Sequence, residues 1–326
     1  MFTNRFYCIV VLTTTLILLG IYADSLAQKR LPRQRKKFEW VSPIVEVPGV
    51  HQRIFYSKIV QSRVSYHIYL PPHYEKDANR RFPVLYWLHG SGPRPITSIR
   101  FLVNWFDEAI GAGKMPPVLV VFPYGRQTMW CDSKDGSVPI ESVFINELIQ
   151  DVDSTFRTVP TRKSRLIEGF SMGGYGALRL GFKYPDLFGT VSSLSGGPLQ
   201  PVFSFSLRAS DRLRKMVLRR VYGGDMEYFK AQSPWRLVEQ NADAIRGQIR
   251  IRLVIGDQDA MLQVTRAFEA HLTELNIPHS FTMLPGVGHK PEAVLNALGG
   301  ANWEFYRQVF QMQSTVSKND SSTVEH

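Results

Sequence analysis

Polar and apolar residues alternate strictly in two neighbouring segments, residues 53–59 and 63–70. The short polar pair Gln61 and Ser62 lies between them, and Pro71 and Pro72 follow the second segment. A period of two residues is typical of a half-buried β-strand. We therefore expect an antiparallel pair of strands in this part of the chain.

Further along, continuous apolar runs alternate with stretches that have helical spacing. Runs of Val, Ile and Leu are typical of parallel strands that are covered on both faces. The predicted strands are residues 84–88, 118–122, 166–168, 191–194, 251–255 and 280–284, and the predicted helices are 101–111, 140–156, 174–184 and 263–275. The pattern therefore predicts an α/β domain with an eight-stranded, mostly parallel sheet flanked by helices.

Residues 198–248 interrupt this alternation and predict a helical insertion between strands six and seven. They contain prolines, a basic amphipathic stretch at residues 212–222 and the break Gly223-Gly224. One interpretation is a lid or acyl-pocket wall over the carboxyl edge of the sheet, lined by the substrate-binding candidates Trp235 and Phe203 or Phe205. The other interpretation is an ordinary packed connection, and the sequence leaves both open.

The first 27 residues have the pattern of a secretory signal. Arg5 precedes an apolar run over residues 6–23, and Ser25-Leu26-Ala27 fits a cleavage site. The run is also long enough to approach a membrane span, and basic residues follow it, so a retained anchor is the alternative. We expect a signal peptide or anchor at 1–27, a basic linker at 28–44, the domain at 45–312 and a disordered tail at 313–326. A secreted, periplasmic or cell-envelope location follows.

The net charge of +11 is concentrated at the N-terminus. Residues 1–37 contain seven Lys/Arg and one Asp, so more than half of the excess lies there. We therefore expect no nucleic-acid partner for the domain. The basic segment suits either contact with anionic lipid head groups or a solvated linker. The sequence does not indicate an oligomeric state.

Cysteine and histidine usage bounds the chemistry. Cys8 lies in the predicted signal, so Cys131 would remain alone and no intramolecular disulfide is expected. The eight histidines are scattered, without the spacing of a zinc site. We expect neither a metal nor a cofactor, and an apolar content of 44% is enough for a substantial core.

The segment from Leu166 to Ala177 has the pattern of a nucleophile elbow. A short apolar strand runs into Gly169-Phe170-Ser171-Met172-Gly173 and then directly into a helical pattern. Such a turn exposes the serine hydroxyl and needs small residues on both sides, because larger side chains would meet neighbouring backbone. Ser171 is therefore the candidate nucleophile.

A serine nucleophile needs a base, and the base needs an acid that orients it. His289 follows the last predicted strand in a glycine-rich loop, which makes it the candidate base; His271 and His279 are expected to be packing or surface residues. Asp257 and Asp259 follow the preceding strand. We prefer Asp259, since Asp257 is close to the strand end and suited to bonding the N–H groups of its own loop.

Backbone N–H groups next to the nucleophile can stabilise an oxyanion. Met172, at the start of the predicted helix, supplies one candidate N–H. The glycine-rich turn after the strand at 84–88 supplies the other, from Gly90 or Ser91. His89 is expected to brace this turn.

These motifs together resemble the putative esterase family of α/β-hydrolases, which contains feruloyl esterases, S-formylglutathione hydrolases and mycolyltransferases. The resemblance covers roughly residues 49–310. It rests on residues 69–74 (Tyr-Leu-Pro-Pro-His-Tyr), 83–90 (Pro-Val-Leu-Tyr-Trp-Leu-His-Gly), 129–133 (Met-Trp-Cys-Asp-Ser) with Glu141 and Glu147-Leu148, and 169–174 (Gly-Phe-Ser-Met-Gly-Gly).

By this resemblance, Ser171, Asp259 and His289 match the family's triad, and the implied reaction is hydrolysis of a carboxylic ester through an acyl-enzyme. An aromatic residue often found after the family's histidine is replaced here by Lys290-Pro291-Glu292, which leaves the acyl pocket undefined. With the predicted export, feruloyl or acetyl esters of polysaccharides are the expected substrates. Acyl transfer to a sugar and a catalytically inactive glycan- or acyl-binding relative are the alternatives.

Overall fold

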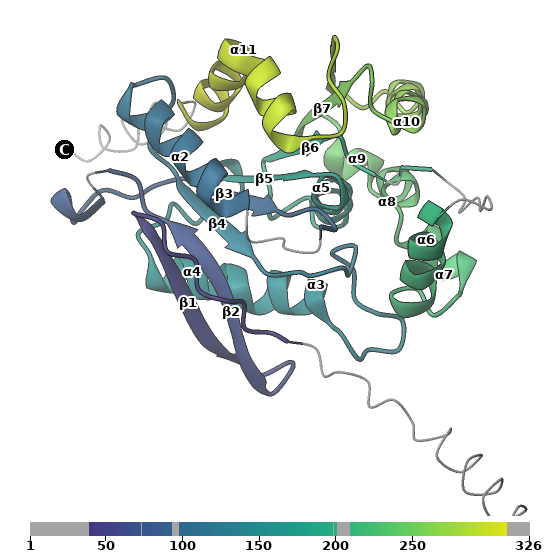
Figure 1. Ribbon diagram of the computed structural model, residues 1–326, viewed down its shortest axis with the longest axis horizontal. Coiled ribbons are helices and arrows are strands. Elements are labelled where there is room, and N and C mark those ends of the chain that lie inside the picture. Colours follow the sequence, from purple (N-terminus) through teal and green to yellow (C-terminus); the bar gives the residue numbers. More distant parts are fainter. Residues whose placement is uncertain (1–38, 73, 93–97, 198, 201–208, 312–326) are drawn as a thin grey trace, which may run out of the picture. The chain divides into compact units, whose positions relative to one another are not determined.

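A computed structural model describes residues 39–72, 74–92, 98–197, 199–200 and 209–311. Its eight-stranded sheet has the order β1-β2-β4-β3-β5-β6-β7-β8 (Figure 1). The strands are β1 Val50–Ser57, β2 Ser62–Tyr69, β3 Val84–Leu88, β4 Leu119–Pro123, β5 Arg165–Phe170, β6 Thr190–Leu194, β7 Arg250–Gly256 and β8 Ser280–Leu284. This confirms the predicted sheet.

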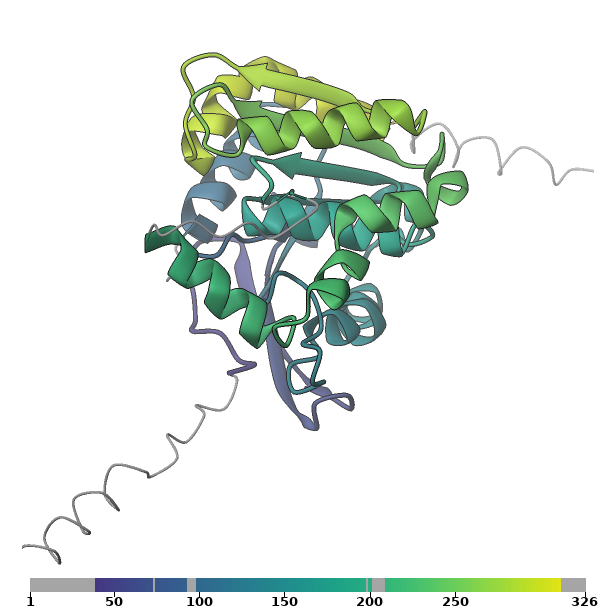
Figure 2. The ribbon, with the colours of Figure 1, turned by 90° about the vertical axis from the view of Figure 1, so that its right-hand side faces the viewer.

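The strand directions follow the predicted pattern. β2 pairs antiparallel with β1 and with β4, whereas β3 to β8 pair in parallel. The arrows of the parallel strands therefore point to one end of the sheet, where the loops after them gather (Figure 2). Ligands of open parallel sheets bind at that carboxyl edge.

Helices cover both faces of the sheet. They are α2 Ser98–Gly111, α3 Ile140–Val143, α4 Ile149–Thr155, α5 Met172–Lys183, α6 Ala209–Arg220, α7 Met226–Ala231, α8 Pro234–Gln240, α9 Ala242–Ile245, α10 Leu262–Glu274 and α11 Pro291–Gln311. The π-helical turn η2 Phe144–Leu148 joins α3 to α4, and 3-10 turns lie at η1 Tyr74–Lys76 and η3 Arg162–Ser164. Among the described residues, no helix is long and apolar enough to cross a membrane.

Side chains of successive strand residues pack alternately into two hydrophobic cores, one on each face of the sheet. Leu85 and Trp87 of β3 pack with α2 and α11, whereas Tyr86 and Leu88 pack on the opposite face with α5 and the helices beside it. Both sets are buried, as expected for a central strand covered on two sides. The α2/α11 layer and the α5 layer lie on opposite sides of the sheet in Figure 1.

The two ends of the domain hold one shifted start and one helix that the sequence did not predict. The folded unit starts at Trp40, within the predicted linker 28–44. Trp40 and Ser42 are buried, the Trp40 carbonyl accepts a hydrogen bond from Ser65 N, and Ser42 N donates to Ser65 Oγ. At the other end, α11 was not predicted; the pair Gly299-Gly300 interrupts its apolar spacing, and Gly299 has non-helical angles.

Between β6 and β7 the described residues form α6, α7, α8 and α9, so the predicted helical character of residues 198–248 is observed there. Leu237 and Val238 of α8 belong to the core that includes α5. Phe203 and Phe205, the predicted signal at 1–27 and the predicted tail at 313–326 lie outside the described residues. The lid role of the segment stays a prediction.

Candidate active site

Ser171 lies at the turn between β5 and α5, with backbone angles φ 57° and ψ −119°. A positive φ is unfavourable for any residue with a Cβ, so the surrounding structure must hold this conformation. Ser171 N donates to Leu194 O, and the Ser171 carbonyl accepts from Gly197 N and Tyr175 N. These bonds tie the turn to the end of β6 and to the first turn of α5.

The glycines on both sides of Ser171 are required by close backbone contacts. A Cβ on Gly173 would overlap the carbonyl group of Leu88, and a Cβ on Gly169 would come within 2.5 Å of Leu88 O. The end of β3 therefore passes directly against the turn. The small residues predicted at both positions match this crowding.

His289 connects Ser171 to Asp259. His289 Nε2 lies 2.9 Å from Ser171 Oγ, and His289 Nδ1 lies 2.8 Å from Asp259 Oδ2. Because the carboxylate can only accept, Nδ1 carries the proton in a neutral ring and Nε2 is free to accept the hydroxyl hydrogen of Ser171. The structure thus brings together the three residues predicted as nucleophile, base and acid.

The Asp259 carboxylate is held as an anion in a buried position. Burial alone would raise the pKa of Asp259, but hydrogen bonds from His289 and from Met261 N outweigh burial and leave the pKa below its ordinary value. The Asp259 side chain is fully buried, whereas that of His289 is 39% exposed. A substrate can therefore reach the imidazole while the acid stays shielded from water.

Asp257 does not contact His289. Its Oδ1 accepts a hydrogen bond from Gly286 N at 2.8 Å, in the loop after β8. The prediction that Asp257 accepts hydrogen bonds from N–H groups of its own loop is therefore wrong. Asp257 instead accepts from the loop after β8, which contains His289. Gly256 is also needed for packing between these loops, since a Cβ there would overlap Val287 O.

The loop after β3 lies against the nucleophile. A Cβ on Gly90 would meet Phe170 O at 3.3 Å and Ser171 Cβ at 3.4 Å. Met172 is the first residue of α5, and the first N–H groups of a helix have no partner within it. The backbones of Gly90 and Met172 are thus both next to Ser171, while their role as oxyanion donors stays a prediction.

His89 braces this loop, as predicted. Its Nε2 accepts a hydrogen bond from Gly125 N at 3.0 Å, and its Nδ1 lies 2.8 Å from Gly90 O. Nδ1 must therefore be the protonated nitrogen, since Gly90 O only accepts. Burial lowers the pKa of His89 to about 4, although the bond to Gly90 opposes this. His89 is neutral near pH 7.

Trp235 makes packing contacts. Its ring stacks on His271 and lies edge-on to Phe268, both in α10, and its indole N–H donates to Leu199 O. None of these partners is Ser171, His289 or Asp259. The contacts of Trp235 therefore do not support its predicted role in substrate binding. His279 bonds Ile277 O, and both His271 and His279 have the packing role expected of them.

Two residues near the triad were not singled out from the sequence. The Phe170 ring lies 4.7 Å from the His289 ring, centroid to centroid, and so packs against the imidazole. The buried hydroxyl of Ser195, the first residue after β6, lies near the Asp259 carboxylate. The position of Ser195 at the carboxyl edge of the sheet is the signal that could have identified it.

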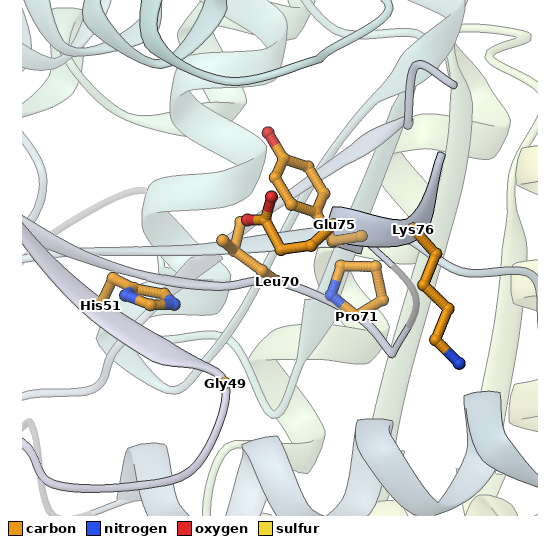
Figure 3. A pocket seen from close by; sticks show the side chains of 7 residues that line it. Gly49, His51, Leu70, Pro71, Glu75 and Lys76 are labelled. Carbon is orange, nitrogen blue, oxygen red and sulfur yellow. The ribbon is translucent and has the colours of Figure 1, made fainter. Parts of the chain in front are cut away.

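A separate hollow of about 330 Å³ lies near the start of β1 (Figure 3). Gly49, His51, Leu70, Pro71, Tyr74, Glu75 and Lys76 line it. Because β2 runs antiparallel to β4, the end of β2 lies at the amino edge of the parallel strands, away from Ser171.

Among the described residues, no cluster of three or more His, Cys, Asp or Glu side chains could hold a metal.

The chain is similar to several known proteins. The sequence matches the family described as "Putative esterase" over residues 57–320. It is 33% identical over 166 residues to an endo-1,4-beta-xylanase/feruloyl esterase of Xylanibacter ruminicola. This match covers 47% of this chain and 22% of that protein. It is 29% identical over 266 residues to an esterase of Mycobacterium tuberculosis, covering 73% of this chain and 56% of that protein.

The chain therefore spans about half or less of the length of these curated relatives. A solved ferulic acid esterase superposes with a TM-score of 0.66 at 23% identity, over 80% of this chain and 98% of that structure. At this identity the likeness concerns the fold, which is that of the α/β-hydrolase esterases.

Proposed function

Because this chain belongs to the putative esterase family, we propose that it is a serine carboxylic-ester hydrolase that acts through an acyl-enzyme. The observation that carries the proposal is the continuous series of contacts from Ser171 Oγ through His289 to the buried Asp259 carboxylate. A serine hydroxyl becomes a useful nucleophile only when such a base is in place.

In the first step, Ser171 Oγ attacks the ester carbonyl carbon and its proton passes to His289 Nε2. Asp259 stabilises the imidazolium that forms and keeps its own charge. The carbonyl oxygen becomes an oxyanion, which accepts hydrogen bonds from Met172 N and from Gly90 N or Ser91 N. These donors are proposed from their backbone positions beside Ser171.

In the second step, the bond between the carbonyl carbon and the alcohol oxygen breaks. The proton on His289 Nε2 passes to the departing alcohol, and the acyl group stays on Ser171. A water molecule then attacks the acyl carbon while His289 takes its proton. The bond to Ser171 Oγ breaks, the serine recovers the proton, and the carboxylic acid leaves.

For the substrate, we propose feruloyl or acetyl esters of polysaccharides. The name of the Xylanibacter relative and the partly exposed His289 support esters attached to a large molecule. The sequence pattern at residues 1–27 supports action outside the cytoplasm. We propose that the linker after this segment ends before Trp40 and that the catalytic domain runs from Trp40 through α11. Mass spectrometry of the mature N-terminus tests cleavage against anchoring.

Hydrolysis of p-nitrophenyl acetate by the purified protein tests the activity. We expect turnover by the wild type and by Ser154→Ala, which makes the same change at an exposed serine of α4, and none above background for Ser171→Ala. Equal rates in wild type and Ser171→Ala would exclude the proposal. A panel of feruloyl, acetyl and longer acyl esters, with and without a sugar acceptor, then separates the substrate classes and hydrolysis from acyl transfer.

A further inference from the structure

Trp130 lies in the loop after β4 and is buried, with 1% of its surface exposed. Its indole fits against two glycines that come from distant parts of the chain. A Cβ on Gly125 or on Gly176 would overlap the ring. Gly176 belongs to α5, five residues after Ser171. The ring is therefore wedged between the loop after β4 and the helix that begins at the nucleophile.

The indole N–H of Trp130 donates to the carbonyl oxygen of His89 at 3.2 Å. The two rings also pack, with centroids 5.0 Å apart. The imidazole of His89 in turn bonds the carbonyl oxygen of Gly90 at 2.8 Å. Two successive carbonyl groups of the loop after β3 are thus held by side chains, one by Trp130 and one by His89.

A held carbonyl fixes the N–H group of the same peptide unit. The peptide bond is planar and trans, so its C=O and N–H point in opposite directions. The unit that contains His89 O contains Gly90 N, and the unit that contains Gly90 O contains Ser91 N. Because Gly90 lies against Ser171, the direction of these N–H groups decides whether an oxyanion on the substrate finds a donor.

We propose that Trp130 is a positioning residue for the oxyanion donors: by holding the His89 carbonyl, its indole N–H sets the orientation of the peptide that presents Gly90 N. The inference rests on the proposed esterase function and adds a residue to that site. Trp130 itself does not touch the substrate. It acts through His89 and Gly90.

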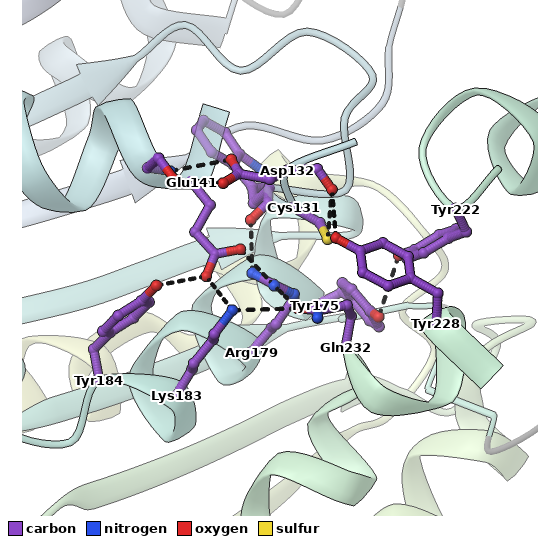
Figure 4. A network of polar contacts seen from close by, with 12 residues as sticks. Cys131, Asp132, Glu141, Tyr175, Arg179, Lys183, Tyr184, Tyr222, Tyr228 and Gln232 are labelled. Carbon is purple, nitrogen blue, oxygen red and sulfur yellow. Dashed lines mark hydrogen bonds and ion pairs between the residues drawn. The ribbon is translucent and has the colours of Figure 1, made fainter. Parts of the chain in front are cut away.

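A buried ion pair holds the backbone of Trp130. Met129 and Trp130 have positive φ angles of 57° and 55°, which residues with a Cβ rarely adopt. Arg179 Nη1 donates to Trp130 O at 3.0 Å, and Arg179 Nη2 lies 2.5 Å from Glu141 Oε2. Arg179 and Glu141 are both buried. Figure 4 shows Arg179 and Glu141 within their network of polar contacts. The unusual backbone conformation of Trp130 therefore has a specific charged support.

Further contacts keep this support ionised. Lys183 Nζ lies 2.7 Å from Glu141 Oε1, and Tyr184 OH donates to the same oxygen at 2.7 Å. Burial alone would raise the pKa of Glu141, but Arg179 and Lys183 outweigh burial and lower the pKa to about 2. Glu141 and Arg179 have no place in the reaction steps proposed above. Holding Trp130 gives this buried pair a function.

The test compares Trp130→Phe, which keeps an aromatic ring but removes the N–H, with wild type and with Trp303→Phe. Trp303 packs on Trp105 away from this loop and so controls for the substitution itself. We expect kcat/KM for p-nitrophenyl acetate to fall by about 10- to 100-fold in Trp130→Phe with KM little changed, since the donors act on the transition state. Trp303→Phe should stay within about twofold of wild type.

A second readout separates orientation from folding. A trifluoromethyl ketone adds to the serine and forms an oxyanion, so its Ki should rise in Trp130→Phe by the same factor by which kcat/KM falls. Inhibition by the alcohol product, which has no acyl oxygen for these donors, should not change. If Trp130→Phe fails to fold, benzothienylalanine at position 130 preserves the ring shape and replaces only the N–H by sulfur.

The outcomes distinguish this inference from the proposed function. A folded variant that lacks the Trp130 N–H but retains the wild-type kcat/KM and Ki would overturn the positioning role. A loss of equal size in Trp303→Phe would overturn it as well. If the wild type does not hydrolyse esters and does not bind the ketone, the proposed function itself fails.

Discussion

His289 Nδ1 lies 2.8 Å from Asp259 Oδ2, and this contact joins the loop after β8 to the loop after β7. The two strands are neighbours in the sheet, so the loops are brought together by strand order. The contact fixes which imidazole nitrogen faces Ser171. The proposed chemistry depends on this tautomer.

Asp259→Asn should lower kcat by roughly 10³- to 10⁴-fold with little change in KM. The amide N–H of asparagine favours the imidazole tautomer with the proton on Nε2, which cannot accept the Ser171 proton. Asp257→Asn is the matched control, because Asp257 bonds Gly286 N and not His289. Steady-state kinetics of both variants check the assignment, and similar losses in the two would contradict it.

Gly173→Ala should lower the free energy of unfolding by about 3 kcal/mol or more, because the added methyl would overlap the Leu88 carbonyl group. Gly300→Ala is the control, since a Cβ at Gly300 meets nothing within 4 Å. In a helix that change is expected to be neutral or to stabilise by about 0.5–1 kcal/mol. Urea denaturation measures both, and an unaffected Gly173→Ala would show that the turn is less crowded than described.

Glu168→Gln should destabilise the fold by roughly 3–5 kcal/mol, because it leaves Arg252 buried without its carboxylate. Glu168 also accepts from Tyr306 OH at 2.6 Å, so the pair ties β5 and β7 to α11. Glu227→Gln removes the exposed pair with Lys230 and should cost less than about 1 kcal/mol. Chemical unfolding curves measure the loss of stability in the two variants. Equal losses would contradict the role of the Glu168–Arg252 pair in holding β5, β7 and α11 together.

Stability should fall as the pH drops below about 6.5. Burial lowers the pKa of both His67 and His89 to about 4, so between these values the unfolded chain binds protons that the folded chain does not. Each histidine should remove roughly 1–2 kcal/mol between pH 6.5 and 5. The ring nitrogens of His67 have no hydrogen-bond partner in the described part of the chain, so His67→Leu should flatten this pH dependence. If stability depends on pH as steeply in His67→Leu as in the wild type, protonation of His67 is not a cause of the loss.

Hydrophobic periodicity was sufficient for the sheet, because β3 to β7 are almost entirely buried and β8, although half exposed, keeps enough apolar residues to be recognised as a strand. It failed for α11, where Gly299-Gly300 breaks the helical spacing. The Ser171, Asp259 and His289 cluster was predictable because each residue follows a strand of the parallel sheet, and strand ends meet at one edge.

Contacts across the sequence could not be predicted in the same way. The bond from Trp130 Nε1 to His89 O spans 41 positions, and Glu141 and Arg179 pair over 38. Neither contact follows from local spacing, because each depends on how loops pack after the sheet has formed. The burial of Trp40 against β2 is of the same kind, since a basic segment precedes it and its polar neighbours resemble a linker.

The most direct test of the central claim is covalent labelling by a fluorophosphonate, followed by mass spectrometry of the digested protein. The account predicts one modified residue, Ser171, with labelling lost in Ser171→Ala, greatly slowed in His289→Ala and retained in Ser154→Ala. A wild-type protein that is not labelled, or that is labelled at another serine, would contradict the assignment of Ser171 as the nucleophile.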